Sequence, residues 1–185
     1  AKQEIADCNW PNKVKNNQED DIRPCIKCLV GCTDNGIIGH HPIRCAVNPT
    51  VYKYYEDKYP QAKVVKNVAV IGAGPAGMEA ALTLVKRGHK VTVYEKRKIG
   101  GTLHEASSAD YKKDIKLFIN YYEKQAQKYH LNIIQEEATY DTIVNGGYDA
   151  CIIATGGKPR TLDVNGLETG KVTYALNYLN GEVKI

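Results

Sequence analysis

Short apolar runs alternate with longer amphipathic stretches in the second half of the chain. Four of the short runs predict strands, at residues 67–71, 91–94, 131–134 and 148–157. Two longer stretches predict helices, at residues 78–87 and 109–129, and the second carries one apolar face made of Ile115, Phe118, Ile119 and Tyr122. This order predicts an α/β fold with an open, mostly parallel sheet and ligands at the carboxyl ends of the strands. Cys151 lies within the last apolar run and is predicted to belong to the core, not to a metal site.

The first predicted strand leads directly into Gly72-Ala73-Gly74-Pro75-Ala76-Gly77. In a dinucleotide-binding βαβ unit, Gly72 permits the tight turn and Gly74 lets the backbone approach a pyrophosphate. Gly77 lets the following helix pack closely on the strand, and the free N–H groups at the helix start face the phosphates. Pro75 suits the first helical turn because its missing N–H is not needed there.

An acidic residue stands where such a unit needs one. Glu95 ends the second predicted strand, 23 residues after Gly72, where a carboxylate can bind ribose hydroxyls. Gly88 is placed to end the intervening helix. An acid at this position disfavours a 2′-phosphate, so FAD or NAD fits better than NADP. The alternative is a structural glycine turn in another kind of α/β protein.

A second glycine pair follows Glu95. Lys96-Arg97-Lys98-Ile99-Gly100-Gly101-Thr102-Leu103 is predicted to bring basic residues and bare backbone to the same end of the sheet. Basic groups near a pyrophosphate are favourable, although an ordinary loop has a similar composition.

Four of the six cysteines fall within 21 residues, in the pattern C-x2-C-x3-C-x12-C. They are Cys25, Cys28, Cys32 and Cys45. Four thiolates suit zinc or an iron–sulfur cluster, and a run of three with a distant fourth favours the cluster over zinc or a metal-free segment. Gly31 and Gly36 are expected to leave room for the backbone to wrap around a bulky cluster. His40 and His41 are expected to be exposed loop residues, and Cys8 an unligated thiol.

Composition narrows the class of protein. A length of 185 residues suits one domain with a small appendage, and the net charge of +4 is spread among acids, which argues against a nucleic-acid partner. No run of 18 apolar residues occurs and the first residues lack a signal peptide, so we expect no membrane partner and a cytoplasmic location. The chain starts without Met, and we expect it to be part of a longer protein.

Three groups of residues together resemble one known family. They are Arg23-Pro24-Cys25-Ile26-x-Cys28 with Cys32, Cys45 and Asn48-Pro49, then the glycine stretch at residues 70–81, then Ala154-Thr155-Gly156. The chain resembles the multidomain branch of the old yellow enzyme family, which includes 2,4-dienoyl-CoA reductase, 2-enoate reductase and trimethylamine dehydrogenase. The similarity runs from about Ile5 to Asn180.

The resemblance implies two cofactor sites in this chain. Cys25, Cys28, Cys32 and Cys45 would be ligands of a 4Fe–4S cluster. The residues expected around the pyrophosphate and ribose of FAD are Gly72, Ala73, Gly74, Pro75, Ala76, Glu95, Lys96, Gly101, Thr102 and Leu103. Lys112 and Ala138 match positions near the adenosine half, and Ala154, Thr155 and Gly156 match the strand end that approaches the flavin. One branch of the family holds ADP in place of FAD.

The resemblance also implies a domain layout. Residues 1–24 would follow a TIM barrel that carries FMN, residues 25–60 would form the 4Fe–4S segment and a tyrosine-rich linker that packs on the neighbouring domain, and residues 61–185 would be part of the FAD domain. An NAD(P)H domain of the same protein would complete the relay from NAD(P)H through FAD and the cluster to FMN.

On this interpretation the chain is the electron-transfer part of an enoate or dienoyl-CoA reductase. The catalytic residues would lie in the barrel, so we expect none here and no activity of this chain alone. Self-association into a homo-oligomer stays open. The alternative is a non-catalytic nucleotide-binding module that is stabilised by zinc and binds a protein partner.

Overall fold

The computed structural model describes residues 1–51, 59–160, 163, 165–170 and 172–184. Its centre is a four-stranded sheet with the order β3-β2-β1-β4, and every pair of neighbours is parallel. The strands are β1 (Asn67–Ile71), β2 (Lys90–Tyr94), β3 (Asn132–Ile134) and β4 (Ala150–Ile153). The predicted parallel α/β sheet is therefore confirmed.

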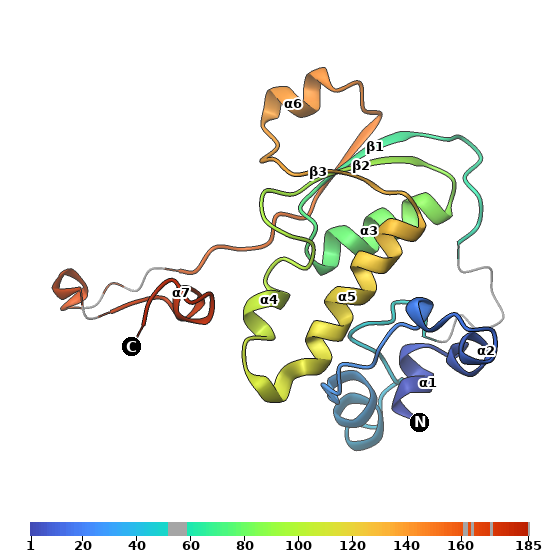
Figure 1. Ribbon diagram of the computed structural model, residues 1–185, viewed down its shortest axis with the longest axis horizontal. Helices are drawn as coiled ribbons and strands as arrows, with labels where there is room; N and C mark the ends of the chain where they lie inside the picture. Colours follow the sequence, from blue (N-terminus) through green and yellow to red (C-terminus); the bar gives the residue numbers. More distant parts are fainter. Residues whose placement is uncertain (52–58, 161–162, 164, 171, 185) are drawn as a thin grey trace.

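Two helices, α3 (Pro75–Lys86) and α5 (Lys113–Lys128), pack on the same side of this sheet (Figure 1). The largest side chains that are fully buried come from the sheet and from α3: Val70, Val93, Met78 and Leu82. Burying one such side chain stabilises a fold by roughly 1.5–3 kcal/mol. The layer between the sheet and these two helices is therefore the main hydrophobic core.

The ends of α3 follow the sequence signals. Pro75 occupies the first turn, where a missing N–H is tolerated. After the last turn, Gly88 adopts a left-handed conformation with φ of 88°, and the backbone N–H of His89 donates to the carbonyl of Leu84. This is the glycine cap that the sequence predicts.

Helix α5 is shorter at its start than the predicted stretch 109–129. A 3₁₀ turn, η3 (Asp110–Lys112), precedes it, and α5 begins at Lys113. Phe118, Ile119 and Tyr122 are buried as the amphipathic pattern predicts. Tyr121 and Gln125 are buried too, because the N-terminal part of the chain covers a second face of this helix.

The prediction of a buried last strand is wrong. β4 lies at the edge of the sheet and pairs only with β1 in the described structure. Ile153 is 76% exposed and Cys151 is exposed, so Cys151 is not a core residue. The apolar run encodes a strand, but the place of that strand in the sheet is decided by pairing and not by its composition.

The N-terminal part forms α1 (Lys2–Ala6), α2 (Trp10–Lys15) and the 3₁₀ turn η1 (Glu19–Asp21), followed by a π-helical turn, η2 (Val30–Ile38). This N-terminal part packs on α3 and α5, since Ala6 and Val47 join the same hydrophobic core. In η1, Asp21 binds Gln125 and Lys128 of α5. Most of the tyrosine-rich stretch that is predicted to pack on the neighbouring domain, residues 52–58, lies outside the described residues.

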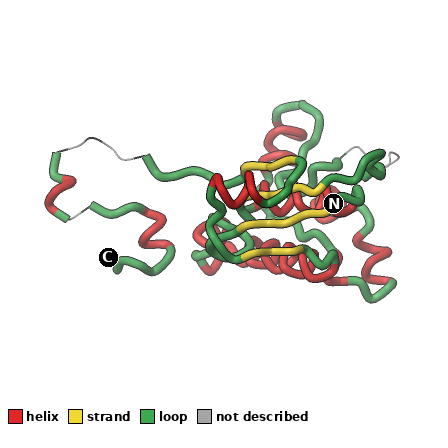
Figure 2. The backbone as a smooth tube through the Cα atoms, turned by 90° about the horizontal axis from the view of Figure 1, so that it is seen from above, coloured by secondary structure: helices red, strands yellow, loops and turns green. Residues whose placement is uncertain are grey.

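The chain after β4 runs away from the sheet and then returns, so that residues 175–179 lie against residues 103–106. Figure 2 shows an extended arm that carries η4 (Leu167–Thr169) and α7 (Ala175–Leu179). Two further short helices belong to the body: α4 (Leu103–Ala106) and α6 (Tyr140–Asn145). Among the helices of the described residues, none has the length and apolar character needed to cross a bilayer.

Candidate functional site

The glycine loop, residues 72–77, connects β1 to α3 at the carboxyl end of the sheet (Figure 1). Gly72 has φ of +100°, and a β-carbon there would lie 2.4 Å from the carbonyl oxygen of Ala154. A β-carbon on Gly77 would lie 1.8 Å from the carbonyl oxygen of Gly72. Neither neighbour is a movable side chain, so these two positions require glycine and the predicted tight turn is present.

Gly74 and Gly101 face each other from two different loops. A β-carbon on Gly74 would meet only the Cα of Gly101, at 4.0 Å, whereas one on Gly101 would lie 3.0 Å from the Cα of Gly74. The backbone N–H of Gly100 donates to the carbonyl of Ala73 at 2.8 Å, which fixes the two loops together. The second glycine pair therefore lies at the same end of the sheet, as its position in the sequence predicts.

This arrangement leaves space beside the Cα of Gly74, at the first turn of α3. The first N–H groups of a helix have no partner within the helix, and its N-terminus carries a partial positive charge. A pyrophosphate needs both the space and the donors. Thr102 and Leu103 continue the second wall, since they are the cap and the first residue of α4.

Glu95 is held against the glycine loop. One carboxylate oxygen, Oε2, accepts a hydrogen bond from the backbone N–H of Ala73 at 2.7 Å, and Oε1 accepts one from the N–H of Arg97 at 2.7 Å. A carboxylate offers about four acceptor positions, so both oxygens keep capacity for ribose hydroxyls. The two backbone N–H groups fix the orientation of Glu95, and its role at a ribose stays a prediction.

The other predicted nucleotide residues fall into two groups. Ala154 and Thr155 lie beside the glycine turn, and the N–H of Ala154 donates to the carbonyl of Ile71 at 2.8 Å. Gly156 follows them with φ of +73° and no atom within 4 Å of its would-be β-carbon. Lys96 forms an exposed ion pair with Glu137, the neighbour of Ala138, at 2.8 Å.

Lys112 is the predicted residue that the structure brings least close to the nucleotide site. It lies in η3 at the start of α5, the end of that helix farthest from the sheet in Figure 1. Within the described part of the chain, no hydrogen bond or ion pair connects its side chain to the glycine loop. Its role stays a prediction.

The four clustered cysteines line one small cavity. Its volume is about 20 Å³, and Cys25, Cys28, Cys32 and Cys45 share it with apolar neighbours, among them Ile5, Ile26 and Val47. Cys28 is exposed and the other three are half-buried. Across residues 1–51 and the other described ranges, no three His, Cys, Asp or Glu side chains converge closely enough to hold a single metal ion.

The backbone around these cysteines is unusual. Lys27 and Leu29 have φ of 55° and 62°, in the left-handed region that favours glycine. The N–H of Lys27 donates to the Sγ of Cys25 at 3.4 Å. Left-handed conformations of residues with a β-carbon cost of order 1–3 kcal/mol and are concentrated at functional sites.

The glycines in this region permit close contacts within the loop. A β-carbon on Gly31 would lie 2.3 Å from the carbonyl oxygen of Arg44, and the N–H of Arg44 donates to the carbonyl of Gly31 at 3.0 Å. Gly31 therefore closes the loop and brings Cys45 next to Cys32, and Gly36 similarly lies against the side chain of Ile43. The backbone therefore approaches closely at these glycines, and its wrapping around a cluster stays a prediction. His40 and His41 are exposed, as predicted.

Sequence reasoning missed the ion pair that joins the two candidate sites. Arg23 Nη1 and Nη2 donate to the two carboxylate oxygens of Glu79 at 2.8 and 3.1 Å, and Nη1 also donates to the carbonyl of Val47. Burial opposes the charge of Arg23, but the ring of Tyr121 and the carboxylate of Glu79 more than offset it and raise its pKa. The only sequence signal is that Glu79 is a lone charge in an apolar helical stretch.

Comparison with known proteins agrees with this geometry. Residues 66–181 match the family described as pyridine nucleotide-disulphide oxidoreductase. The chain is 40% identical over 169 residues to an NADH oxidase of Thermoanaerobacter brockii and 34% identical over 166 residues to a cinnamate reductase of Clostridium sporogenes. Each alignment covers 89% of this chain but only 26% and 25% of the relative.

A solved structure of a 2-naphthoyl-CoA reductase in complex with 2-naphthoyl-CoA matches all of this chain with a TM-score of 0.94 and 35% identity. The match covers 28% of that protein, so the chain spans about a quarter of the length of these relatives. The resemblance found in the sequence is confirmed. This chain belongs to the pyridine nucleotide-disulphide oxidoreductase family and corresponds to the nucleotide-binding part of multidomain flavin oxidoreductases of the old yellow enzyme type.

Proposed function

We propose that this chain is the electron-relay part of an NADH-dependent flavin oxidoreductase of the enoate reductase type. In this proposal the glycine loop and Glu95 bind FAD, or ADP in its place, and the four clustered cysteines bind a 4Fe–4S cluster. FMN and NAD(P)H would bind to other domains of the same protein. The relatives named NADH oxidase and cinnamate reductase support this class of reaction.

The observation that carries the proposal is that all four cysteines of the motif line one cavity. A single zinc ion lies about 2.3 Å from each thiolate, which demands four sulfurs in mutual contact. A cubane is held at four separate corners, so its thiolates lie farther apart. The spacing of the motif, a run of three cysteines with a distant fourth, supports the cluster over zinc.

The cavity is small for a cluster, and this has a structural consequence. A volume of about 20 Å³ accommodates about one water molecule. A cluster held by all four cysteines would therefore extend beyond this cavity, on the side of the exposed Cys28.

The residues of the chain would have distinct tasks. The N–H groups at the start of α3 bind the pyrophosphate, and the bare backbones of Gly74 and Gly101 let it approach. Glu95 orients the ribose through its hydroxyls. When bound, FAD and the cluster supply electron transfer between NAD(P)H and FMN. Arg23 holds both ends of the cysteine segment, residues 23–47, against α3 through Glu79 and the carbonyl of Val47.

Metal analysis after anaerobic reconstitution tests the proposal. We expect iron and acid-labile sulfide in equal amounts in the native protein and their loss in Cys28→Ala, because a methyl group cannot replace a thiolate ligand. Cys151→Ala is the matched control, since both cysteines are exposed, and it should keep the iron. Zinc in place of iron, or full iron content in Cys28→Ala, would overturn the cluster assignment and favour a zinc-stabilised module.

A further inference from the structure

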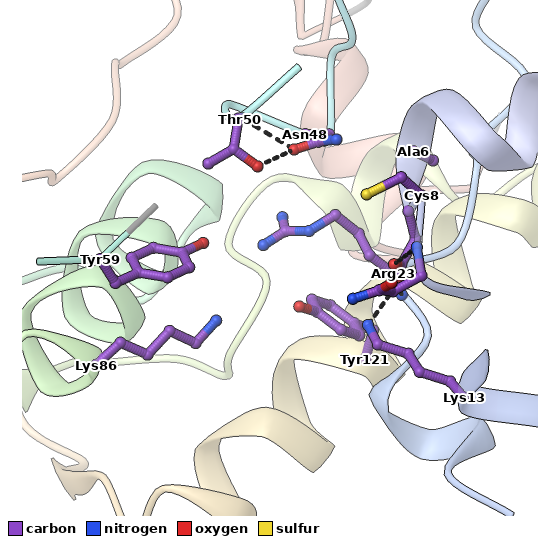
Figure 3. Close-up of a pocket in the computed structure, with 11 residues that line it drawn as sticks. Ala6, Cys8, Lys13, Arg23, Asn48, Thr50, Tyr59, Lys86 and Tyr121 are labelled. Carbon is purple, nitrogen blue, oxygen red and sulfur yellow. Dashed lines mark hydrogen bonds and ion pairs between the residues drawn. The ribbon is translucent and has the colours of Figure 1, made fainter. Parts of the chain in front are cut away.

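A polar cavity lies apart from both candidate sites, between the N-terminal part of the chain and the helices α3 and α5 (Figure 3). Its volume is about 210 Å³, and no residue of the glycine loop and none of the four clustered cysteines lines it. Its charged and aromatic walls are Asp7, Lys13, Arg23, Tyr59, Lys86 and Tyr121. Lys86 is the last residue of α3, so this cavity and the pyrophosphate position lie at opposite ends of the same helix.

The acids near this cavity are already paired. Asp7 accepts hydrogen bonds from Lys13 Nζ at 2.5 Å and from the backbone N–H of Arg23 at 2.9 Å. Glu79 binds the guanidinium of Arg23 with both oxygens. Lys86 forms no ion pair with any residue of the described ranges, and its ammonium instead lies 4.7 Å from the ring centroid of Tyr59. Among the described residues, the charge of Lys86 is therefore the one positive charge of the cavity that no carboxylate balances.

The hydroxyl of a largely buried tyrosine also faces the cavity. Tyr121 is only 7% exposed. The guanidinium of Arg23 lies over its ring, with Cζ of Arg23 5.0 Å from the ring centroid. Figure 3 shows the Tyr121 hydroxyl directed into the cavity, on the side of Arg23 and Lys86. The hydroxyl is not one of the buried polar atoms that lack a partner in the described part of the chain, so it is accessible from the cavity and can donate a hydrogen bond to a ligand there.

Arg23 keeps further donors. A guanidinium has five N–H groups, and the three hydrogen bonds to Glu79 and the carbonyl of Val47 leave two of them. The bidentate fork that would suit a planar carboxylate is occupied by Glu79. The donors that remain for a ligand, on Lys86, Tyr121 and Arg23, lie on separate walls of the cavity. A tetrahedral anion can accept hydrogen bonds from such separate directions.

We propose that this cavity binds a small tetrahedral oxyanion, either inorganic phosphate or the terminal phosphate of a small metabolite. Lys86 supplies the balancing charge, and Tyr121 and Arg23 donate hydrogen bonds to it. Burial and the neighbouring Arg23 lower the pKa of Lys86 to about 8, so an anion in the cavity would favour its charged form. This site is independent of the electron-relay proposal and holds whichever metal the cysteines bind.

Titration with inorganic phosphate tests the site, with saturating ADP present to occupy the glycine loop. Trp10 is the only tryptophan and directly follows Asn9 of the cavity wall, so its fluorescence and calorimetry can both report binding. We expect one saturable step in the native protein. Losing one hydrogen bond to a charged group weakens affinity about ten- to a hundredfold, so Lys86→Gln and Tyr121→Phe should each lose about tenfold or more.

Two controls make the outcome decisive. Lys66→Gln removes an exposed lysine outside the cavity and should leave phosphate affinity unchanged. Gly74→Ala should also keep the phosphate step, because it alters only the nucleotide site. Absence of a saturable step, equal affinity in Tyr121→Phe, or loss of the step in Gly74→Ala would overturn the proposal. Glucose 6-phosphate in the same titration then distinguishes a metabolite phosphate from free phosphate, and tighter binding of either one assigns the source.

Discussion

The glycine loop and the cysteine segment both contain glycines that permit close backbone contacts, but the two regions are held in different ways. Around the glycine loop, Gly72, Ala73 and Ala154 form backbone hydrogen bonds to Tyr94, Gly100 and Ile71, and the strands beneath are in continuous register. In the cysteine segment, η2 leaves large apolar side chains in solvent: Val30, Ile37 and Ile38 are 61%, 67% and 68% exposed.

The difference shows where each geometry comes from. The nucleotide site is built by regular backbone pairing, so it exists before any ligand binds. The cysteine segment has no sheet to rest on and is anchored mainly at its two ends, by Arg23 and by Val47 in the core. We therefore expect ligand removal to loosen the cysteine segment while the sheet stays intact.

The largest effect is expected when that anchor is cut. Glu79→Ala leaves the guanidinium of Arg23, whose side chain is 8% exposed, without its partner. Removing one member of a buried ion pair costs about 3–5 kcal/mol, which urea unfolding can measure. Asp114→Ala is the matched control, because its partner Lys27 is 60% exposed, and it should cost less than about 1 kcal/mol. Equal costs for the two variants would contradict the view that Arg23 anchors the segment.

A smaller effect is expected for the ribose contact. Glu95→Ala removes charged hydrogen bonds and should weaken ADP binding by about 1.5–3 kcal/mol, roughly ten- to a hundredfold by calorimetry. Glu137→Ala removes an exposed acid whose pKa is lowered by its hydrogen bond from Lys96, and it should leave the affinity almost unchanged. Unchanged affinity in Glu95→Ala would mean that the ribose binds elsewhere.

How much the sequence predicts depends on how local the signal is. The turn at Gly72, the place of Pro75 in the first turn of α3 and the cap at Gly88 were predicted, because each depends on a few neighbouring residues. The exposure of Cys151 was not, because the place of β4 at the sheet edge depends on pairing across the whole domain. The pair of Arg23 and Glu79 joins positions 56 residues apart, and a single sequence holds no signal that connects them.

The candidate sites divide in the same way. The cysteine spacing predicted four side chains around one site, and the structure places all four around one cavity. The cavity at Lys86 and Tyr121 was not predicted, because its walls come from α2, α3, α5 and the segment before Cys25. Each of these residues alone resembles an ordinary surface lysine or core tyrosine.

The smallest effect is a pH dependence that comes from Lys86. Its pKa is about 8 in the folded chain, below the ordinary value of 10.5, because of burial and the charge of Arg23. Between these values the unfolded chain binds more protons, so stability rises as pH increases through 8. The gain should be about 1 kcal/mol between pH 7 and pH 9.

Comparison with Lys86→Met isolates this contribution from that of other groups. Arg23, Lys13 and Lys128 lower the pKa of Lys86 and Glu79 raises it, and all four remain in the variant, as do the rings of Tyr59 and Tyr129. Urea unfolding at several pH values should show a flatter profile for Lys86→Met. Parallel profiles would show that Lys86 keeps an ordinary pKa.

The bare backbones of Gly74 and Gly101, which face each other at close range, are expected to hold a pyrophosphate, and paired measurements on two glycine variants test this claim most directly. A β-carbon at Gly74 meets no atom closer than 4.0 Å, so Gly74→Ala should keep the native melting temperature yet bind ADP more than tenfold more weakly. A β-carbon at Gly77 would lie 1.8 Å from the carbonyl oxygen of Gly72, so Gly77→Ala should lose about 1–3 kcal/mol of stability. Native ADP affinity in Gly74→Ala would contradict the claim.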